Sequence, residues 1–380
     1  MTELQLAMGQ QFGWTARFLV RLREDRVYFS IIGVFFALTA GLDRLTDHSY
    51  LLETTYAYLN FWMAVALTMF AAALSMQFVS RAVRDRHERP FELLYDVLKF
   101  IFTPETVAGL ILSAALTVFM GAFTAVKSEL PILNDFWADP WLARADLIVN
   151  FGHDPWSLLQ PVLGQHWITR AIEFVYAPVW TASVIFVPFL FCVTTRMPAH
   201  RNRFIMAYLL TWIVSGVILA GVFMSGGPAF YGELTHDQAR YGELVRYLRF
   251  DMGTPFSAAW DQRLLWKLHS ENSATVGAGI SAFPSLHVSM ILLCCLGVWQ
   301  VSRRFACVFL AIAAVIVLGS VHLGWHYSVD TYAAILITLL IWKAADHVTS
   351  GQGENPWLRH QFIENRTESD ANWIGGPGRT

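Results

Sequence analysis

Long apolar runs alternate with short polar segments along most of this chain, and the runs have the length of membrane-spanning helices. A helix needs about 17 to 25 predominantly apolar residues to cross a bilayer. Eight runs meet that length, and they cover residues 27–43, 58–80, 106–126, 171–193, 204–224, 285–301, 305–321 and 331–347. The pattern predicts an all-α, polytopic membrane helix bundle of about eight transmembrane helices.

The composition agrees with a membrane protein. Hydrophobic residues make up 55% of the chain and charged residues only 15%, well below the roughly 25% of soluble domains. The formal net charge of −2 argues against a nucleic-acid partner, which would favour a basic surface. The first apolar run starts only near Tyr28 and has no small-residue cleavage site after it, so we expect no cleaved signal peptide.

Basic residues in the short loops predict the orientation, because cytoplasmic loops carry an excess of lysine and arginine. They precede the first run and lie between runs two and three, four and five, and six and seven, whereas the loop after the first run holds only Arg44. Both termini are therefore expected in the cytoplasm, in what we take to be a bacterial inner (cell) membrane. The basic residues are Arg17, Arg21, Arg23, Arg26, Arg81, Arg84, Arg86, Arg89, Lys99, Arg196, Arg201, Arg203, Arg303 and Arg304.

Three parts are expected along the chain. Residues 1–130 would form three N-terminal membrane helices, residues 131–348 a catalytic membrane domain, and residues 349–380 a disordered cytoplasmic tail. The long loops 127–170 and 225–283 would face outside. Segment 134–167 is rich in tryptophan, which suits an interfacial anchor or a groove for lipid entry.

Two polar clusters lie directly against apolar runs, one from Ser281 to His287 and the other from His322 to Asp330. Ionisable residues at such positions are costly and are functional candidates. His326 and Asp330 are four residues apart, so a helix starting near His326 would place them on one face, within hydrogen-bonding reach. Such a carboxylate would fix the imidazole tautomer and leave the second ring nitrogen free.

His287 lies one helical hairpin upstream of His326. The chain between them fits one helix across the membrane, a short turn at Arg303 and Arg304, and one helix back. Both histidines would therefore lie at the same membrane surface, where they could supply a nucleophile and a general acid. Ser285 directly precedes a predicted helix start, where backbone N–H groups and the helix dipole favour a bound phosphate.

Other readings of these residues stay open. A histidine at a helix end, such as His322 or His153, can be an ordinary hydrogen-bonded polar residue. Two facing histidines could also ligate haem or a metal, as in a haem- or quinone-binding membrane protein, or the protein could be non-catalytic. A transporter is disfavoured because the titratable residues cluster at helix ends on one side.

The two clusters resemble the signature of a known enzyme superfamily. Pro284-Ser285-Leu286-His287 resembles the Pro-Ser-x-His motif of the type 2 phosphatidic acid phosphatase (PAP2) superfamily, and the segment from Leu323 to Asp330 resembles the end of its third motif. Gly227-Pro228-Ala229-Phe230-Tyr231, and the run from Asp139 to Trp156 that contains Asp146, are similar to the inositolphosphotransferase branch, the relatives of inositol phosphorylceramide synthase. The resemblance covers roughly residues 130–345.

The resemblance implies a role for each residue of the set. His326 would attack phosphorus and form a phosphohistidine, Asp330 would orient His326, and His287 would protonate the leaving oxygen and then activate the acceptor. Ser285 and nearby N–H groups would hold the phosphoryl oxygens. No cofactor and no metal are implied.

The expected function is that of an integral membrane phospholipid headgroup phosphotransferase at the outer membrane face. A phospholipid would be the donor, and a lipid alcohol or water the acceptor. A lipid phosphate phosphatase of the same superfamily is the alternative.

The chain departs from the superfamily in its basic residues. Gly319-Ser320 stands where the third motif usually opens with Ser-Arg, and no Lys-x6-Arg-Pro motif is found. Another group must then balance the phosphate charge. The turn at Gly226-Gly227-Pro228 either ends a helix or brings N–H groups to the phosphate, with Phe230 and Tyr231 beside the lipid. Candidate phosphate-binding side chains are His322, Arg240, Arg246, Arg249, Arg263 and Lys267.

Overall fold

The computed structural model describes residues 13–85, 97–99, 101–194 and 198–350, and every regular element in these residues is a helix. The all-α prediction is confirmed. The predicted tail beyond Ser350, and the orientation arguments from Arg86, Arg89 and Arg196, lie outside the described residues.

The eight predicted spans all correspond to helices. Within the described residues, seven helices are long and apolar enough to cross a membrane, and α16 is a shorter apolar helix of 16 residues. Two spans are interrupted by π-helical turns, η1 (Val175–Val179) and η2 (Val214–Leu219). In chain order the spanning elements are α3 (Arg26–Thr46), α4 (Tyr50–Asp85), α6 (Pro104–Leu133), α9 (His166–Phe174) with η1 and α10 (Trp180–Val193), α11 (Pro198–Ile213) with η2 and α12 (Ala220–Val222), α16 (Leu286–Val301), α17 (Arg303–His322) and α18 (Ser328–Thr349).

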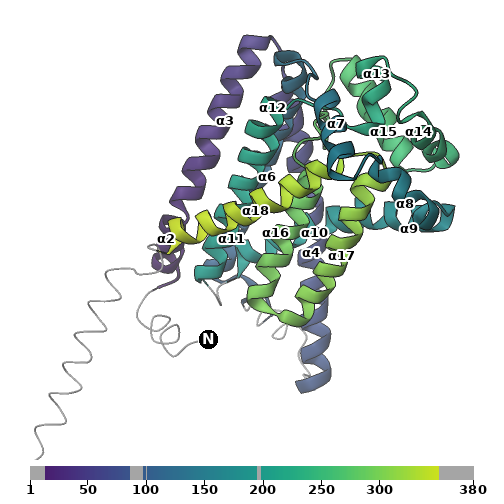
Figure 1. Ribbon diagram of the computed structural model, residues 1–380. Coiled ribbons are helices and arrows are strands. Elements are labelled where there is room, and N and C mark those ends of the chain that lie inside the picture. Colours follow the sequence, from purple (N-terminus) through teal and green to yellow (C-terminus); the bar gives the residue numbers. More distant parts are fainter. Residues whose placement is uncertain (1–12, 86–96, 100, 195–197, 351–380) are drawn as a thin grey trace, which may run out of the picture.

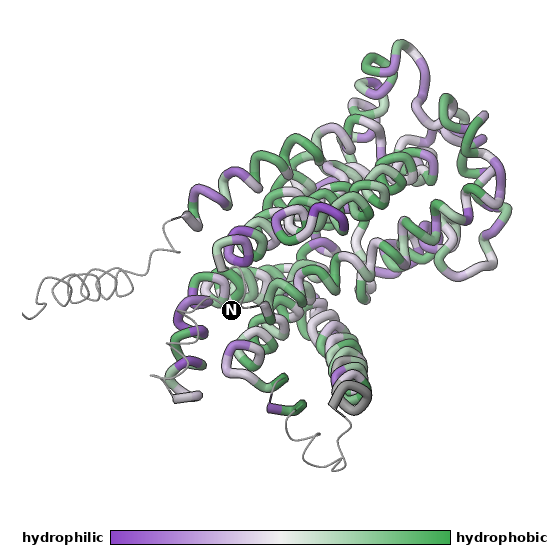
Figure 2. The backbone as a smooth tube through the Cα atoms, turned by 90° about the horizontal axis from the view of Figure 1, so that it is seen from below, coloured by the Kyte–Doolittle hydropathy of each residue, from purple (hydrophilic) through white to green (hydrophobic). Residues whose placement is uncertain are grey.

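Short helices from the two long loops gather at one end of the bundle, at the upper right of Figure 1. Apolar positions predominate along the long helices in Figure 2, and polar positions lie mostly at helix ends and in the connections. This distribution suits a bundle whose sides face lipid. The remaining elements are α2 (Trp14–Glu24), α7 (Asp139–Val149), α8 (Pro155–Leu163), η3 (Pro228–Phe230), α13 (Tyr231–Thr235), α14 (Gly242–Leu248), η4 (Arg249–Asp251) and α15 (Ala258–Ser270).

Local sequence explains where key helices begin. Thr103 precedes α6 and accepts a hydrogen bond from the Thr106 N–H at 3.2 Å, while Pro104 occupies the first helical position, where a missing N–H costs nothing. Ser285 caps α16 in the same way, accepting from the Val288 N–H. These caps fix the starting residues of α6 and α16.

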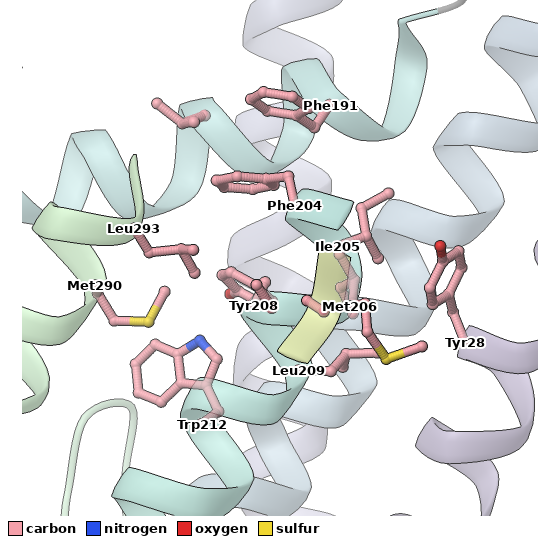
Figure 3. Packing of buried hydrophobic residues seen from close by; sticks show 14 of the residues in the cluster. Tyr28, Phe191, Phe204, Ile205, Met206, Tyr208, Leu209, Trp212, Met290 and Leu293 are labelled. Carbon is pink, nitrogen blue, oxygen red and sulfur yellow. The ribbon is translucent and has the colours of Figure 1, made fainter. Parts of the chain in front are cut away.

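The largest buried cluster joins helices from both halves of the chain. It combines Tyr28 of α3 with aromatic and aliphatic residues of α10, α11 and α16, as Figure 3 shows. Phe191 and Phe204 stack with ring centroids 4.1 Å apart. Residues of α6 belong to the same cluster, so side chains on either side of the expected boundary near residue 130 pack into a common core.

A buried ion pair lies at the opposite end of the bundle from the short helices. The Arg201 guanidinium at the start of α11 donates two hydrogen bonds to the carboxylate of Asp25, at 2.6 and 2.8 Å, and both side chains are fully buried. The sequence analysis treated Arg201 as a loop charge. In the structure it connects α11 to the beginning of α3.

Candidate active site

The two polar clusters meet where α16 and α18 begin and α17 ends. His287 lies in the first turn of α16, and His326 lies in the connection between α17 and α18. Their rings are 6.2 Å apart between centroids, at an interplanar angle of 58°. The helical hairpin therefore returns His326 to His287, as the run lengths predict.

A backbone carbonyl holds the His326 ring. Nδ1 lies 2.8 Å from the Ala282 carbonyl oxygen, which can only accept, so Nδ1 carries the proton and Nε2 keeps its free lone pair. The side chain is 6% exposed. Burial lowers the pKa of His326 to about 3, the Ala282 hydrogen bond acts against this, and the positive charge of Lys127 adds to it. The ring is neutral at physiological pH.

Asp330 contacts His326 differently from the prediction. Helix α18 begins at Ser328, two residues after His326, so the two side chains do not share a helical face. The Asp330 carboxylate instead accepts the Tyr327 N–H at 3.0 Å and lies 3.6 Å from His326 Nδ1. The distance exceeds a hydrogen bond. Asp330 acts on the ring as a nearby, fully buried carboxylate, while Ala282 sets the ring's orientation.

Ser285 connects the starts of α16 and α18. Its side chain is fully buried and caps α16, with Oγ accepting the Val288 N–H at 3.4 Å. Its own N–H donates to the Asp330 carbonyl at 3.3 Å. The position of Ser285 at the helix start agrees with the sequence analysis.

Aromatic side chains from a distant helix pack against His287. The Tyr176 ring stacks on it at 4.4 Å and the Trp180 ring lies at 4.2 Å, while Trp180 Nε1 donates to the His287 carbonyl at 2.9 Å. Tyr176 lies within the π-helical turn η1, a feature that often marks functional sites. The sequence analysis did not identify either residue, since a π-helical turn leaves no apolar pattern of its own.

Two buried aspartates of α7 accept hydrogen bonds from the segments that surround the site. Asp146 accepts the Ser328 hydroxyl at 2.7 Å and the N–H groups of Ser328 and Val329, at 3.0 and 2.9 Å. Asp139 accepts the Tyr327 hydroxyl at 2.8 Å and the two N–H groups of the Gly226-Gly227 turn. Burial raises the pKa of both carboxyls, and these hydrogen bonds oppose the shift.

Of the two roles left open for the glycine turn, the structure does not favour that of a phosphate cradle. The N–H groups of Gly226 and Gly227 both donate to Asp139, at 2.8 and 2.9 Å, so they are occupied within the protein. Gly227 has φ +88° and packs directly against the Trp325 carbonyl. Tyr231 is buried against the Tyr241 ring, away from a lipid-facing position.

The basic candidates from the outer loop are engaged elsewhere or exposed. Arg240 pairs with Asp154 at 2.9 Å, Arg246 is exposed, and Lys267 is 64% exposed beside Glu271. The buried His322 shares a hydrogen bond of 3.0 Å with Thr169. Within the described residues, none of these four side chains makes a hydrogen bond or ion pair with His287 or His326.

Lys127 is the basic residue that the sequence analysis missed. It lies on α6, directly after the third predicted span, and its positive charge contributes to the lowered pKa of His326. The available signal was a lone lysine at the end of an apolar run. Within the part of the chain that the structure describes, no three metal-binding side chains are grouped to hold a metal ion.

Comparison with known families adds one finding. The family model described as PAP2 superfamily matches residues 140–344, more than half of the chain, including the segments that carry His287, His326 and Asp330. No curated protein and no solved structure matches the chain.

Proposed function

The chain belongs to the PAP2 superfamily of phosphatases and phosphotransferases, and from this premise we propose that it transfers the phospho-headgroup of a phospholipid to a lipid alcohol. The observation that carries the proposal is the histidine pair. One ring is buried, neutral and held at Nδ1, and the second lies 6.2 Å away. Such a pair supplies a nucleophile and a separate proton donor.

In the first step His326 Nε2 attacks the phosphorus of the donor. The P–N bond forms while the bond from phosphorus to the diacylglycerol oxygen breaks, and protonated His287 gives its proton to that leaving oxygen. In the second step His287 takes the proton of the acceptor hydroxyl, the acceptor oxygen attacks phosphorus, and the P–N bond breaks. His326 then regains its lone pair and His287 its proton.

The surroundings of each histidine support this assignment. The rings of Tyr176 and Trp180, at 4.4 and 4.2 Å, can stabilise an imidazolium at His287 through cation–π attraction. Asp330, at 3.6 Å from His326 Nδ1, balances the positive charge that His326 gains as a phosphohistidine. The start of α16 at Ser285 presents the positive end of a helix dipole to the phosphoryl oxygens.

Burial favours transfer over hydrolysis. His326 is 6% exposed and Asp330 is fully buried. Little water therefore reaches the face of the phosphohistidine that lies against these two residues. A lipid alcohol that fills the acceptor position would exclude water further. The resemblance of the segment around Asp139 and Asp146 to the inositolphosphotransferase branch points in the same direction.

The decisive assay uses purified protein with phospholipids of different headgroups, labelled in the phosphate, with and without a lipid-alcohol acceptor. We expect label in an acceptor product, and formation of that product should depend on the acceptor concentration. Release of label to water in both conditions would instead identify a lipid phosphate phosphatase. His326→Ala should abolish both products, whereas His153→Ala, at an exposed histidine, should behave as wild type. If His326→Ala retains turnover, His326 is not the nucleophile.

We also propose that the site faces outside the inner membrane and the termini lie in the cytoplasm. The basic residues Arg201, Arg303 and Arg304 lie at helix starts at the end of the bundle opposite the histidines, in agreement with the positive-inside rule. Single cysteines at the exposed Val276 and at Arg303 test the orientation in a Cys307→Ser background, since the other three native cysteines are buried. An impermeant maleimide should label the first in intact cells and the second only after permeabilisation; the reverse would invert the orientation.

A further inference from the structure

We propose that Lys127 of α6 binds the phosphate of the substrate and replaces the basic residues that the superfamily motifs supply. The inference rests on the proposed function. It assigns a phosphate-binding role to a residue outside the matched segment 140–344, contributed by one of the N-terminal membrane helices.

The residue at the position of the missing motif arginine cannot supply the positive charge that the phosphate needs. Ser320 occupies it and is fully buried, with Oγ donating to the Val317 carbonyl at 2.8 Å and 3.1 Å from the Thr331 hydroxyl. A phosphate in a half-dry site needs a charged donor. That donor must come from another element.

Helix α6 passes beside the start of α16. Phe123 belongs to the same buried cluster as Leu286, the residue between Ser285 and His287. Both side chains meet at Gly216, where a Cβ would lie 2.6 Å from Phe123 and 3.0 Å from Leu286. Lys127 lies one turn after Phe123, on the same face of α6.

The segment that precedes α16, whose Ala282 carbonyl orients His326, packs against the aliphatic part of the Lys127 side chain. A Cβ on Gly279, which has φ +93°, would lie 2.8 Å from Lys127 Cγ and 2.8 Å from its carbonyl oxygen. Three residues later, the Ala282 carbonyl accepts the proton of His326 Nδ1. The side chain of Lys127 therefore packs against the segment that orients the nucleophile.

The ammonium of Lys127 has no partner in the described structure. Within those residues it makes no ion pair and donates no side-chain hydrogen bond, although the side chain is half-buried. A partly buried cation without a counter-ion is costly, and an incoming anion removes that cost. One ammonium matches the single negative charge of a phosphodiester.

The experiment compares Lys127→Met and Lys127→Arg with Lys343→Met, a control at an exposed lysine far along α18. Lys127→Met should lower kcat/KM for the phospholipid donor by about 10²-fold or more, the effect of removing one charged donor. Lys127→Arg should restore most of it, and Lys343→Met should match wild type. Removing the positive charge should also shift the acid limb of the pH–activity profile to higher pH.

Orthovanadate binding provides a readout independent of turnover. Vanadate should raise the melting temperature of the wild-type protein and of Lys127→Arg, and should not do so for Lys127→Met. A protein that turns over no phospholipid would refute the proposed function, and the vanadate arm would still decide the role of Lys127. Wild-type kcat/KM together with undiminished vanadate protection in Lys127→Met would overturn the inference.

Discussion

Gly227→Ala should disable the site by adding one methyl group at some distance from the chemistry. The Cβ would lie 2.4 Å from the Trp325 carbonyl oxygen and 3.2 Å from the Ala282 Cβ. Both neighbours position His326, because Trp325 directly precedes it and Ala282 accepts its Nδ1 proton. The backbone at Gly227 also has φ +88° and ψ 175°, a conformation almost restricted to glycine that a residue with a Cβ adopts at a cost of roughly 1–3 kcal/mol.

The geometry sets the size of the effect. A carbon–oxygen contact is about 3.3 Å at its closest, so the Trp325 carbonyl must move by about 0.9 Å to admit the methyl group. A misplacement of about 1 Å in a reacting group costs on the order of 10²-fold in rate. We therefore expect kcat to fall about 10²-fold, with a loss of roughly 1–3 kcal/mol in stability from the backbone conformation.

The assay is acceptor-dependent transfer together with thermal melting in detergent, and Gly226→Ala is the matched control. Its Cβ would meet the flexible end of Leu234 at 2.5 Å and the Phe230 Cβ at 3.2 Å, and its φ is not positive. Rotation of Leu234 can relieve the closer contact, so Gly226→Ala should stay within a few-fold of wild type. Equal activity in the two variants would refute the argument that the Gly227–Trp325 contact positions His326.

Three further predictions concern buried polar groups that stabilise the site and the helix bundle. Asp146→Asn removes the charge that accepts three hydrogen bonds at the start of α18, so it should destabilise the protein by about 2–3 kcal/mol; an unchanged melting temperature would contradict this. The neutral His326 ring contributes stability that is complete above its unfolded pKa of about 6.5 and is lost as the pH falls toward about 3. Acidification from pH 7.5 to 4.5 should therefore lower the melting temperature of wild type more than that of His326→Gln, and equal shifts would argue against a buried neutral ring. Arg201→Met leaves the Asp25 carboxylate buried alone and should cost about 3–5 kcal/mol, while adding Asp25→Asn should recover most of it; no recovery would show that the loss is not one of charge.

The membrane helices and the histidine pair could be predicted because both depend on run length. In lipid every backbone polar group needs an internal partner, so a long apolar run has to be a helix. Two such runs with a short turn between them return His326 to His287. The partner of Arg201 could not be predicted in this way, because Asp25 lies far away in sequence and no local pattern connects them.

The finer geometry of the site depended on backbone contacts that the sequence pattern does not encode. The contact of Asp330 with His326 differs from the predicted one because α18 begins at Ser328, where Asp146 accepts N–H groups that have no partner within the helix. Lys127 was missed because its apolar run ends at residue 126, which places the lysine in the expected outer loop 127–170, whereas α6 continues to Leu133 and packs the lysine against Gly279.

The position of the histidines at helix ends limits which lipids can reach them. His287 lies in the first turn of α16 and His326 just before the first turn of α18, so under the proposed function both would lie at the depth of phospholipid headgroups in a single leaflet. Donor and acceptor could then react without either headgroup entering the hydrocarbon core, and diacylglycerol would be released into the same leaflet that supplied the donor. Under the proposed function, turnover would change the composition of one leaflet alone, and lipid asymmetry would grow until lipids crossed the bilayer by another route.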